Sequence, residues 1–243
     1  MGSFFFNLGR NVRATMRKGK WVVQSLTGSE AEAIEAEFEL GRDLAWGMLR
    51  QMEADTDPRA VQLLEGLGNR LAGSVRDRRR RFCACPVQAA EVNAFALPGG
   101  FLFVTRPLLD LCGWDADEVA FILGHEMGHV LHGHAMQRIL DGWMLHAAGR
   151  VMPVRGMAGA WLMQQAGELI HKSYSRDQEL EADLLGVRLA NAAGFDARAA
   201  VRLLGRLQAG AGPASELTAY FATHPPVVDR IGQINRYLLG CGV

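Results

Sequence analysis

Hydrophobic residues recur at the helical period of about 3.6 residues through most of the chain. The first such stretch covers residues 29–53, and glutamates crowd its first turns, where the helix dipole favours negative charge. Asp115 or Asp117 can cap a long helix that includes Glu118 and continues to about Leu140. Further helices are predicted over residues 58–72, 177–193, 197–208 and 229–239.

Strand patterns are confined to one region between the helical blocks. Residues 82–87 and 91–97 form short apolar runs, Pro98-Gly99-Gly100 is typical of a turn, and residues 101–105 form the clearest strand. The predicted fold class is therefore α+β and mostly α-helical. One small, hairpin-rich sheet is expected beside the helix that starts near Glu118.

The length of 243 residues suits a single domain with a short extension. We divide the chain into a basic N-terminal extension, residues 1–28, and one domain, residues 29–243. In the extension, basic residues follow Phe4-Phe5-Phe6, the reverse of the order in a cleavable secretory signal. The segment is expected to be a solvated leader or a peripheral contact with an anionic membrane surface.

No stretch reaches the roughly 20 apolar residues of a spanning helix. Residues 143–170 come nearest, and they favour two amphipathic helices around a hinge at 153–159. A cytoplasmic protein, or one peripheral to a membrane, is the resulting expectation. The formal net charge of +0 gives no indication of nucleic-acid binding, and the four cysteines suggest reduced thiols. The basic run 76–81 is expected to be a solvated face or turn, with a substrate or lipid contact as the lesser alternative.

The segment from His125 to His129 carries the chain's most informative chemistry. On a helix, His125 and His129 lie four residues apart and project from one face, so both imidazoles can reach one metal ion. Glu126 lies beside the first histidine, where its carboxylate can activate a water molecule without binding the metal. Zinc suits this chemistry, because it lowers the pKa of water and polarises a carbonyl group.

A catalytic zinc site needs a third protein ligand. The metzincin pattern would place glycine and histidine where this chain has His132 and Ala135, so that pattern fails. A downstream helix offers Glu179 as the ligand. Asp183, one turn further on, is expected to accept the other N–H of a zinc histidine, for which we favour His125. Glu181 points away from that face, and His132 and His134 are expected to be solvated or to support the ligands indirectly.

Three ordered blocks resemble the HtpX-like and CAAX-prenyl-endopeptidase-type zinc metallopeptidases, a family that includes Oma1-like proteases. The blocks are residues 93–100, residues 125–129, and residues 175–183 with Ser175-Arg176, Glu179 and Ala182-Asp183. A weaker block contains His224-Pro225-Pro226 and Asp229-Arg230-Ile231. The chain lacks the spanning helices of the membrane-embedded members, which puts a prenylated or membrane-protein substrate in doubt.

The resemblance implies a gluzincin fold in which an active-site helix lies beside a small sheet with a substrate-binding edge strand. The residues that match this edge are Asn93, Ala94, Phe95 and Ala96; a purely structural hairpin is the alternative. His224 is expected either to be a buried or capping residue, or to lie near the zinc. In the second case it donates to the oxyanion or blocks the open coordination position.

The expected function is that of an endopeptidase with one Zn²⁺ per chain, acting on polypeptide substrates such as unfolded or damaged proteins. Two alternatives remain: a zinc-dependent chaperone that binds unfolded chains and cleaves little, and a structural helical protein with accidental motifs. The intact Glu126 argues against a pure binding protein, which does not need that carboxylate.

Overall fold

A computed structural model describes residues 28–148, 173–210, 220, 224 and 229–241. The elements are α3 (Glu30–Leu49), α4 (Pro58–Ser74), β1 (Cys83–Val87), β2 (Ala94–Leu97), η2 (Pro98–Gly100), β3 (Phe101–Thr105), α5 (Arg106–Leu111), α6 (Ala116–Leu131), α7 (His134–Ala148), α9 (Arg176–Ala192), α10 (Ala199–Ala209) and α12 (Asp229–Cys241). The predicted α+β class, mostly helical with one small sheet, is confirmed.

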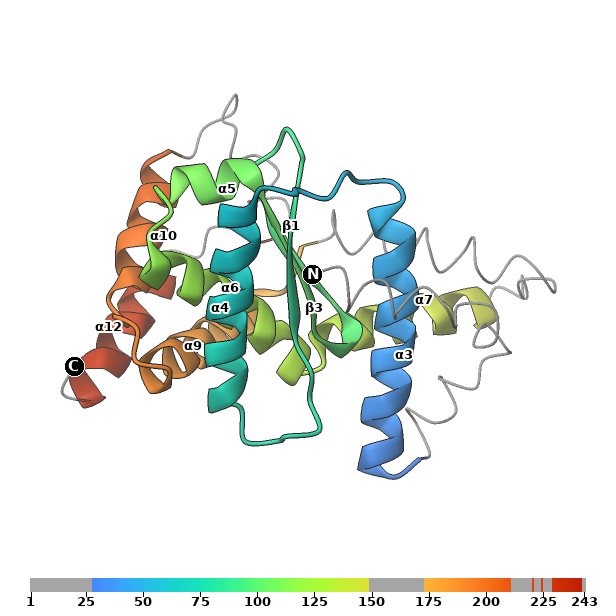
Figure 1. Ribbon diagram of the computed structural model, residues 1–243. Helices are drawn as coiled ribbons and strands as arrows, with labels where there is room; N and C mark the ends of the chain where they lie inside the picture. The colour runs from blue at the N-terminus through green and yellow to red at the C-terminus, as the bar shows by residue number, and fades with distance from the viewer. Residues whose placement is uncertain (1–27, 149–172, 211–219, 221–223, 225–228, 242–243) are drawn as a thin grey trace.

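The sheet has the strand order β1-β3-β2 and lies between α4 and α3 (Figure 1). β2 and β3 form the expected antiparallel hairpin, whereas β1 runs parallel to β3. A parallel pair needs a long connection, and here β2 and its turn lie within that connection. β2 therefore occupies one edge of the sheet as the structure describes it.

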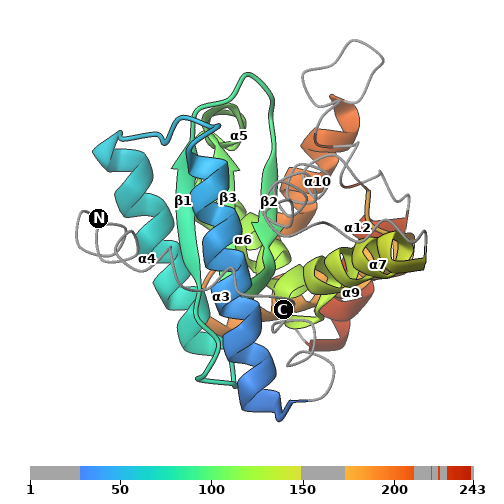
Figure 2. The same cartoon turned by 90° about the vertical axis from the view of Figure 1, so that its right-hand side faces the viewer.

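Both faces of the sheet are buried, which explains why its strands read as continuous apolar runs. Ala94, Ala96, Leu102 and Val104 face a core shared with α4 and α6. The alternate residues face a second core shared with α3 and α7, and they include Phe95, Leu97, Phe101 and Phe103. Figure 2 shows α3 in front of the sheet and α6 behind it.

Helix α3 is attached to the sheet through the turn after β2 and through the basic run. Glu37 accepts the N–H of Gly99 at 3.0 Å and pairs with Arg80 at 2.6 Å. Glycine is required at position 99 for two reasons. Its φ is +75°, which other residues rarely adopt, and a Cβ there would lie 2.5 Å from the Cα of Phe38. The basic run 76–81 is mostly solvated, as expected, since four of its five arginines are exposed, and in addition it pairs with α3. Its remaining pairs with α3 are Arg79–Glu30 and Arg81–Glu35.

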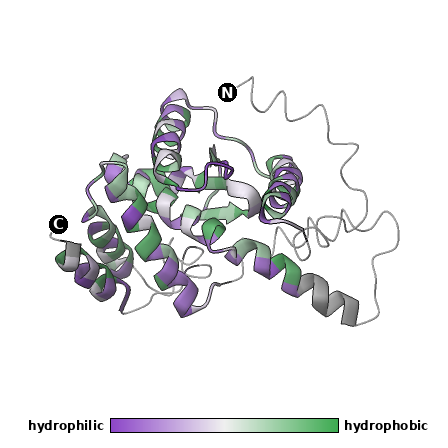
Figure 3. Ribbon diagram, turned by 90° about the horizontal axis from the view of Figure 1, so that it is seen from below, coloured by the Kyte–Doolittle hydropathy of each residue, from purple (hydrophilic) through white to green (hydrophobic). Residues whose placement is uncertain are grey.

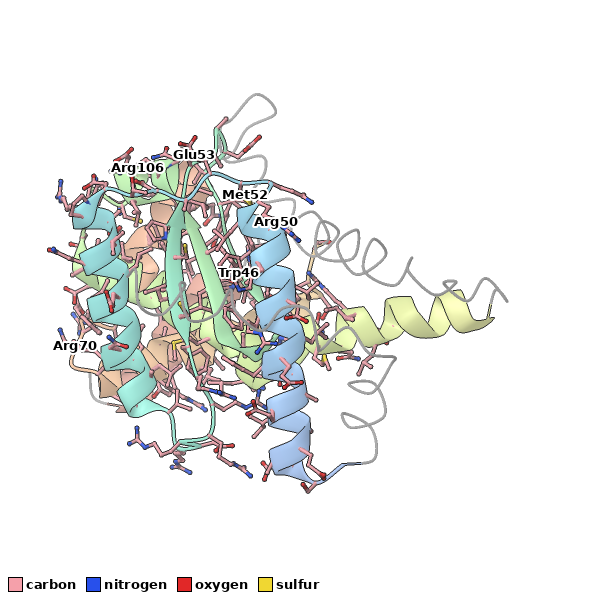
Figure 4. All side chains as sticks on the ribbon, turned by 45° about the vertical axis from the view of Figure 1, so that its right-hand side comes forward. Trp46, Arg50, Met52, Glu53, Arg70 and Arg106 are labelled. Carbon is pink, nitrogen blue, oxygen red and sulfur yellow. The ribbon has the colours of Figure 1, made fainter. Side chains whose placement is uncertain are left out.

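Two arginines labelled in Figure 4 join segments that are distant in sequence. Arg106, at the start of α5, donates two hydrogen bonds to Asp55 at 2.6 and 2.8 Å in the linker between α3 and α4. Arg70 on α4 donates to the carbonyl oxygen of Ala193 at 2.7 Å, just beyond α9, and its guanidinium lies 3.9 Å from the ring centroid of Phe195. These contacts attach both ends of α4 to the rest of the fold.

The prediction of one helix from Glu118 to Leu140 is wrong, because the chain breaks between α6 and α7. Gly133 has a φ of +74° and its N–H donates to the carbonyl of Val130 at 3.0 Å, which ends α6 in a left-handed residue. Apolar periodicity continues across the break, so periodicity alone conceals it. Helix α7 then leaves in a new direction and projects from the body of the molecule (Figure 3).

Helices α6 and α9 cross with their backbones in direct contact. A Cβ on Gly186 would lie 2.7 Å from the backbone nitrogen of His125, and one on Gly128 would lie 2.9 Å from the Cα of Ala182. Gly124 meets Gly186 in the same way, with 2.9 Å between its Cβ position and the Gly186 oxygen. Only glycine permits this approach, because backbone atoms cannot yield as a flexible side chain can.

Several predictions concern residues outside the described ranges. They include nearly all of the extension 1–28, so the domain boundary at residue 29 remains a prediction, and most of the proposed helix pair within 143–170. Among the residues that are described, no helix is long and apolar enough to cross a membrane. Cys83, Cys85 and Cys112 are free thiols, as expected.

Replacing Gly186 by alanine is expected to destabilise the fold by about 1–3 kcal/mol, because the new Cβ overpacks the α6–α9 crossing. Urea unfolding of the metal-free protein measures this loss. Gly66 on α4 is the matched control, since a Cβ there would meet nothing within 4 Å. Gly66→Ala is expected to stabilise by about 0.5–1 kcal/mol through helix propensity, and equal effects of the two substitutions would contradict the packing argument.

Candidate metal centre

Helix α6 supplies two histidines and a glutamate to a fully enclosed site. The side chain of Asp115 caps the helix by accepting the N–H groups of Asp117 and Glu118, both at 3.0 Å. One turn apart on the same face, His125 and His129 bring their Nε2 atoms to 3.2 Å from each other. Both rings and the side chain of Glu126 are buried.

Helix α9 delivers the carboxylates. It begins at a capping box in which Ser175 and Gln178 satisfy each other's backbone N–H groups. The glycine crossing then brings Glu179 against α6, with its Oε1 3.3 Å from His129 Nε2 and its Oε2 3.7 Å from His125 Nε2. Glu179 is completely buried.

These separations fit a tetrahedral zinc ion. Ligand atoms about 2.1 Å from a tetrahedral metal lie about 3.4 Å from one another. The nearest atoms of His125, His129 and Glu179 are 3.2, 3.3 and 3.7 Å apart, the last two distances being to different oxygens of Glu179. With His224, these residues place one donor atom each within 4.8 Å of the others. Two imidazoles and one carboxylate are also donor types that zinc commonly takes in catalytic sites.

Asp183 lies where it can orient the first histidine. Its Oδ1 is 2.9 Å from Nδ1 of His125, so it can accept the Nδ1–H and leave the Nε2 lone pair facing the donor group. Arg230 of α12 donates to both oxygens of Asp183 at 2.6 Å, and its Nη1 lies 3.2 Å from Glu179 Oε2. One buried guanidinium thus contacts both buried carboxylates of α9.

The second histidine contacts His134, for which indirect support of the ligands was one of two expectations, and Tyr174, to which the sequence assigned no role. Nδ1 of His129 lies 3.0 Å from Nδ1 of His134, whose Nε2 lies 3.2 Å from Glu181 Oε2. The ring of Tyr174 stacks on His129 with centroids 3.6 Å apart, and Arg138 covers the other side of Tyr174. The glycine at position 133, a residue type that commonly ends a helix, is the sequence signal that could have indicated a break before His134.

Glu126 and His224 complete the group. His224 Nδ1 lies 3.0 Å from Glu179 Oε1 and 3.3 Å from His125 Nε2, while its Nε2 lies 3.4 Å from Glu126 Oε1. The sequence left two alternatives for His224, a buried residue or one near the metal. In the structure His224 is both buried and adjacent to the other donor atoms. Within the described part of the chain, Glu126 Oε2 has no hydrogen-bond partner. A buried, unpartnered carboxylate oxygen of this kind is a position for a water molecule or substrate atom.

The charges of the site follow from burial and from its ion pairs. Burial lowers the pKa of His129 well below its usual value, which keeps the imidazole neutral and able to bind a metal. Burial raises the pKa of Glu126, although His224 and His125 oppose the shift. Burial is the largest influence on Asp183 and acts to raise its pKa, but the charge and hydrogen bonds of Arg230, together with the contact with His125, outweigh it, and the net shift of the pKa is downward. Burial likewise acts to raise the pKa of Glu179, but the charge of His224 and the hydrogen bonds to His129 and His224 together outweigh it, so the pKa lies well below its usual value.

The predicted edge residues Asn93–Ala96 lie at the outer strand of the sheet, next to α6. Asn93 precedes β2 and is hydrogen-bonded to the end of β3. Its backbone N–H donates to Thr105 Oγ1 at 2.9 Å, and its backbone carbonyl oxygen accepts the N–H of Thr105 at 3.0 Å. Ala94, Phe95 and Ala96 pair with β3 on one side only within the described residues. The side chains of β2 are buried in the two cores.

Comparison with known proteins agrees with this geometry. Residues 58–238 match the model of peptidase family M48. The mitochondrial metalloendopeptidase OMA1 of Schizosaccharomyces pombe is 32% identical over 154 residues, covering 60% of this chain and 43% of that protein. The metalloprotease YcaL of Escherichia coli is 26% identical over 219 residues, covering 86% and 80%. The β-barrel assembly-enhancing protease of Yersinia pestis is 27% identical over 228 residues, covering 86% and 46%. The chain thus spans less than half the length of two of these relatives.

Replacing Arg230 by methionine is expected to cost the metal-free protein about 3–5 kcal/mol of stability, because Asp183 and Glu179 lose the guanidinium that compensates their buried charge. The difference in unfolding free energy between the variant and wild type should have its full size at neutral pH. It should shrink as the pH falls below about 4, because Asp183 has a lowered pKa in the folded state and its protonated form no longer needs the cation. Denaturant unfolding between pH 3 and 7 measures both effects.

Arg176 provides the matched control, since it pairs with Asp229 at the exposed end of the same helices. Arg176→Met is expected to change stability by less than about 1 kcal/mol, as exposed pairs do. A similar loss in both variants would show that Arg230 acts through general charge rather than through its buried pairs.

Proposed function

Because this chain belongs to peptidase family M48, whose members are zinc metallopeptidases, we propose that it is an endopeptidase that hydrolyses peptide bonds with one zinc ion per chain. The observation that carries the proposal is the buried group of His125, His129 and Glu179 with Glu126 beside it. The unpartnered oxygen of Glu126 favours a catalytic site, because a structural zinc site needs no additional carboxylate beside its ligands.

His125, His129 and Glu179 are the proposed zinc ligands. Zinc held there would supply a Lewis acid that lowers the pKa of water and polarises the scissile carbonyl group. Asp183 and Arg230 support this assignment, because their contacts leave the Nε2 lone pair of His125 free to bind. The contact between His129 and His134 does the same for the second ring when His129 Nδ1 is the donor.

Glu126 is the proposed general base and acid. It takes a proton from the attacking water and returns it to the leaving amine. Burial raises its pKa, which makes the carboxylate a stronger proton acceptor than an exposed glutamate. Its unpartnered Oε2 provides the acceptor atom.

His224 is proposed to act at the same centre in one of two ways. The contact of Nδ1 with Glu179 and His125 supports a resting state in which His224 takes up the remaining donor position. The contact of Nε2 with Glu126 supports a role in donating to the oxyanion of the substrate after a small movement. The blocking role needs a neutral His224 ring, whereas the oxyanion role needs a ring that donates a proton. Burial acts to lower the pKa of His224, but the neighbouring carboxylates of Glu179 and Glu126 raise it overall.

The proposed substrates are unfolded or damaged polypeptides that pair with the edge at Asn93–Ala96. An extended segment can add to β2 as a further strand through main-chain hydrogen bonds. Such pairing requires an accessible, unfolded peptide and makes little demand on its side chains. A protein that binds these chains without cleaving them is the alternative, and a peripheral membrane contact of residues 1–28 remains a further proposal that rests on their basic and aromatic residues.

Replacing Glu126 by glutamine is expected to retain one zinc per chain and to lower cleavage of unfolded casein by about 10²–10⁴-fold, because proton transfer is lost. Zinc content and casein cleavage are measured on the same chelator-free preparations. The exposed Glu65 on α4 gives the control, and Glu65→Gln should keep both zinc and activity. Zinc without cleavage in wild type and variant alike would support the binding protein instead, and no zinc in either would end the proposal.

Replacing His224 by alanine separates its two roles, since neither is needed to hold the zinc. Loss of casein cleavage with zinc retained would assign His224 to the oxyanion. A rise in cleavage, most visible in the first turnover, would assign it to blocking the open position, and this is the outcome that its contact with Glu179 favours. Unchanged turnover would contradict both roles.

A further inference from the structure

A second cluster of metal-binding side chains lies at the junction of α6 and α7. His132 is the C-cap of α6, His134 begins α7, and the left-handed Gly133 lies between them. The two imidazole rings are stacked, with centroids 5.4 Å apart and planes 14° from parallel. Glu181 approaches from α9 with its Oε2 3.2 Å from His134 Nε2. One donor atom from each residue lies within 4.8 Å of the other two.

We propose that His132, His134 and Glu181 form a second binding site for a divalent transition-metal ion such as Zn²⁺. Two imidazoles and one carboxylate are borderline donors that suit zinc and its neighbours better than magnesium or calcium. Three protein ligands leave one position for solvent. The site is separate from the proposed catalytic one, because it uses none of the same donor atoms.

The cluster combines one fixed ligand with two adjustable ones. His134 is buried, and its ring is fixed by the contact with His129. His132 and Glu181 are exposed, with 55% of the Glu181 side chain accessible. The exposed pair can move onto an ion from solvent, but ordering these side chains costs entropy. The second site is therefore weaker than the buried one and responds to free zinc above the level that fills the first.

The direction of one hydrogen bond couples the two sites. His129 Nδ1 and His134 Nδ1 lie 3.0 Å apart, so one of them must donate a proton to the other. If His129 is to bind zinc through Nε2, its proton lies on Nδ1 and His134 accepts it. The proton of His134 is then on Nε2, where Glu181 accepts it.

An ion at the second site reverses this arrangement. It takes the lone pair of His134 Nε2, so the His134 proton moves to Nδ1 and is donated to His129. As long as the 3.0 Å contact is kept, the proton of His129 must then lie on Nε2, which can no longer bind zinc. Binding at the second site thus weakens binding at the first. This coupling rests on the proposed catalytic site, whereas the second site itself does not.

The test is a zinc titration of the chelator-treated full chain, by calorimetry and by competition with a chromophoric chelator. Wild type is expected to bind one tight and one weaker equivalent. His132→Ala should retain the tight equivalent and lose at least about tenfold in affinity at the weaker one, since one of three ligands is gone. Gln137→Ala, on the exposed face of α7, is the matched control and should behave as wild type.

Casein cleavage at increasing free zinc tests the coupling. Wild type and Gln137→Ala should lose activity as the weaker site fills, with faster release of the tight zinc to the chelator. His132→Ala should keep the basal rate and require at least about tenfold more zinc for the same loss. A single equivalent in wild type, or two unaltered equivalents in His132→Ala, would overturn the second site and leave the peptidase proposal intact. Two equivalents with unaltered release and activity would overturn the coupling, and no bound zinc at all would overturn both proposals.

Discussion

The direct backbone contact between α6 and α9 is the constraint on which the site depends. Here the two helices that carry the imidazole and carboxylate side chains pack with their backbones in contact, and this approach places the nearest donor atoms of the two helices 3.3 to 3.7 Å apart. Gly124, Gly128 and Gly186 allow that approach by removing the side chains that would separate the axes. The glycines beside the two histidines therefore set the distance from His125 and His129 to Glu179, although they contribute no donor atom.

Such close packing encloses charged groups that then need partners. Asp183 and Glu179 are both buried, and an isolated buried carboxylate would become protonated or destabilise the fold. Arg230 compensates both, and it comes from α12, more than forty residues further along the chain. The C-terminal helix is thereby made part of the site. Its guanidinium keeps Asp183 ionised, and an ionised Asp183 can in turn fix the ring of His125.

The sequence predicts local features well and long-range ones poorly. Capping residues and apolar period place most helices within a few residues, and the four-residue spacing predicts that His125 and His129 share a face. The break at Gly133 was readable in principle, since glycine commonly ends a helix, but the uninterrupted apolar period favoured continuation. The parallel pairing of β1 with β3, and the contacts of Tyr174 and Arg230 with the site, depend on how distant elements pack. No periodicity within a single segment contains that information.

The way the sheet is buried bears on the kind of substrate it could accept. Successive residues of β2 point into two different cores, Ala94 and Ala96 toward α6, and Phe95 and Leu97 toward α3. Glu37 and Gly99 fix the end of the strand to α3, so the strand cannot readily turn its side chains outward. A peptide that paired with β2 would therefore meet main-chain N–H and C=O groups rather than side chains. If the edge binds substrate as proposed, selectivity must come chiefly from whether a chain is extended and unfolded, and only secondarily from its sequence.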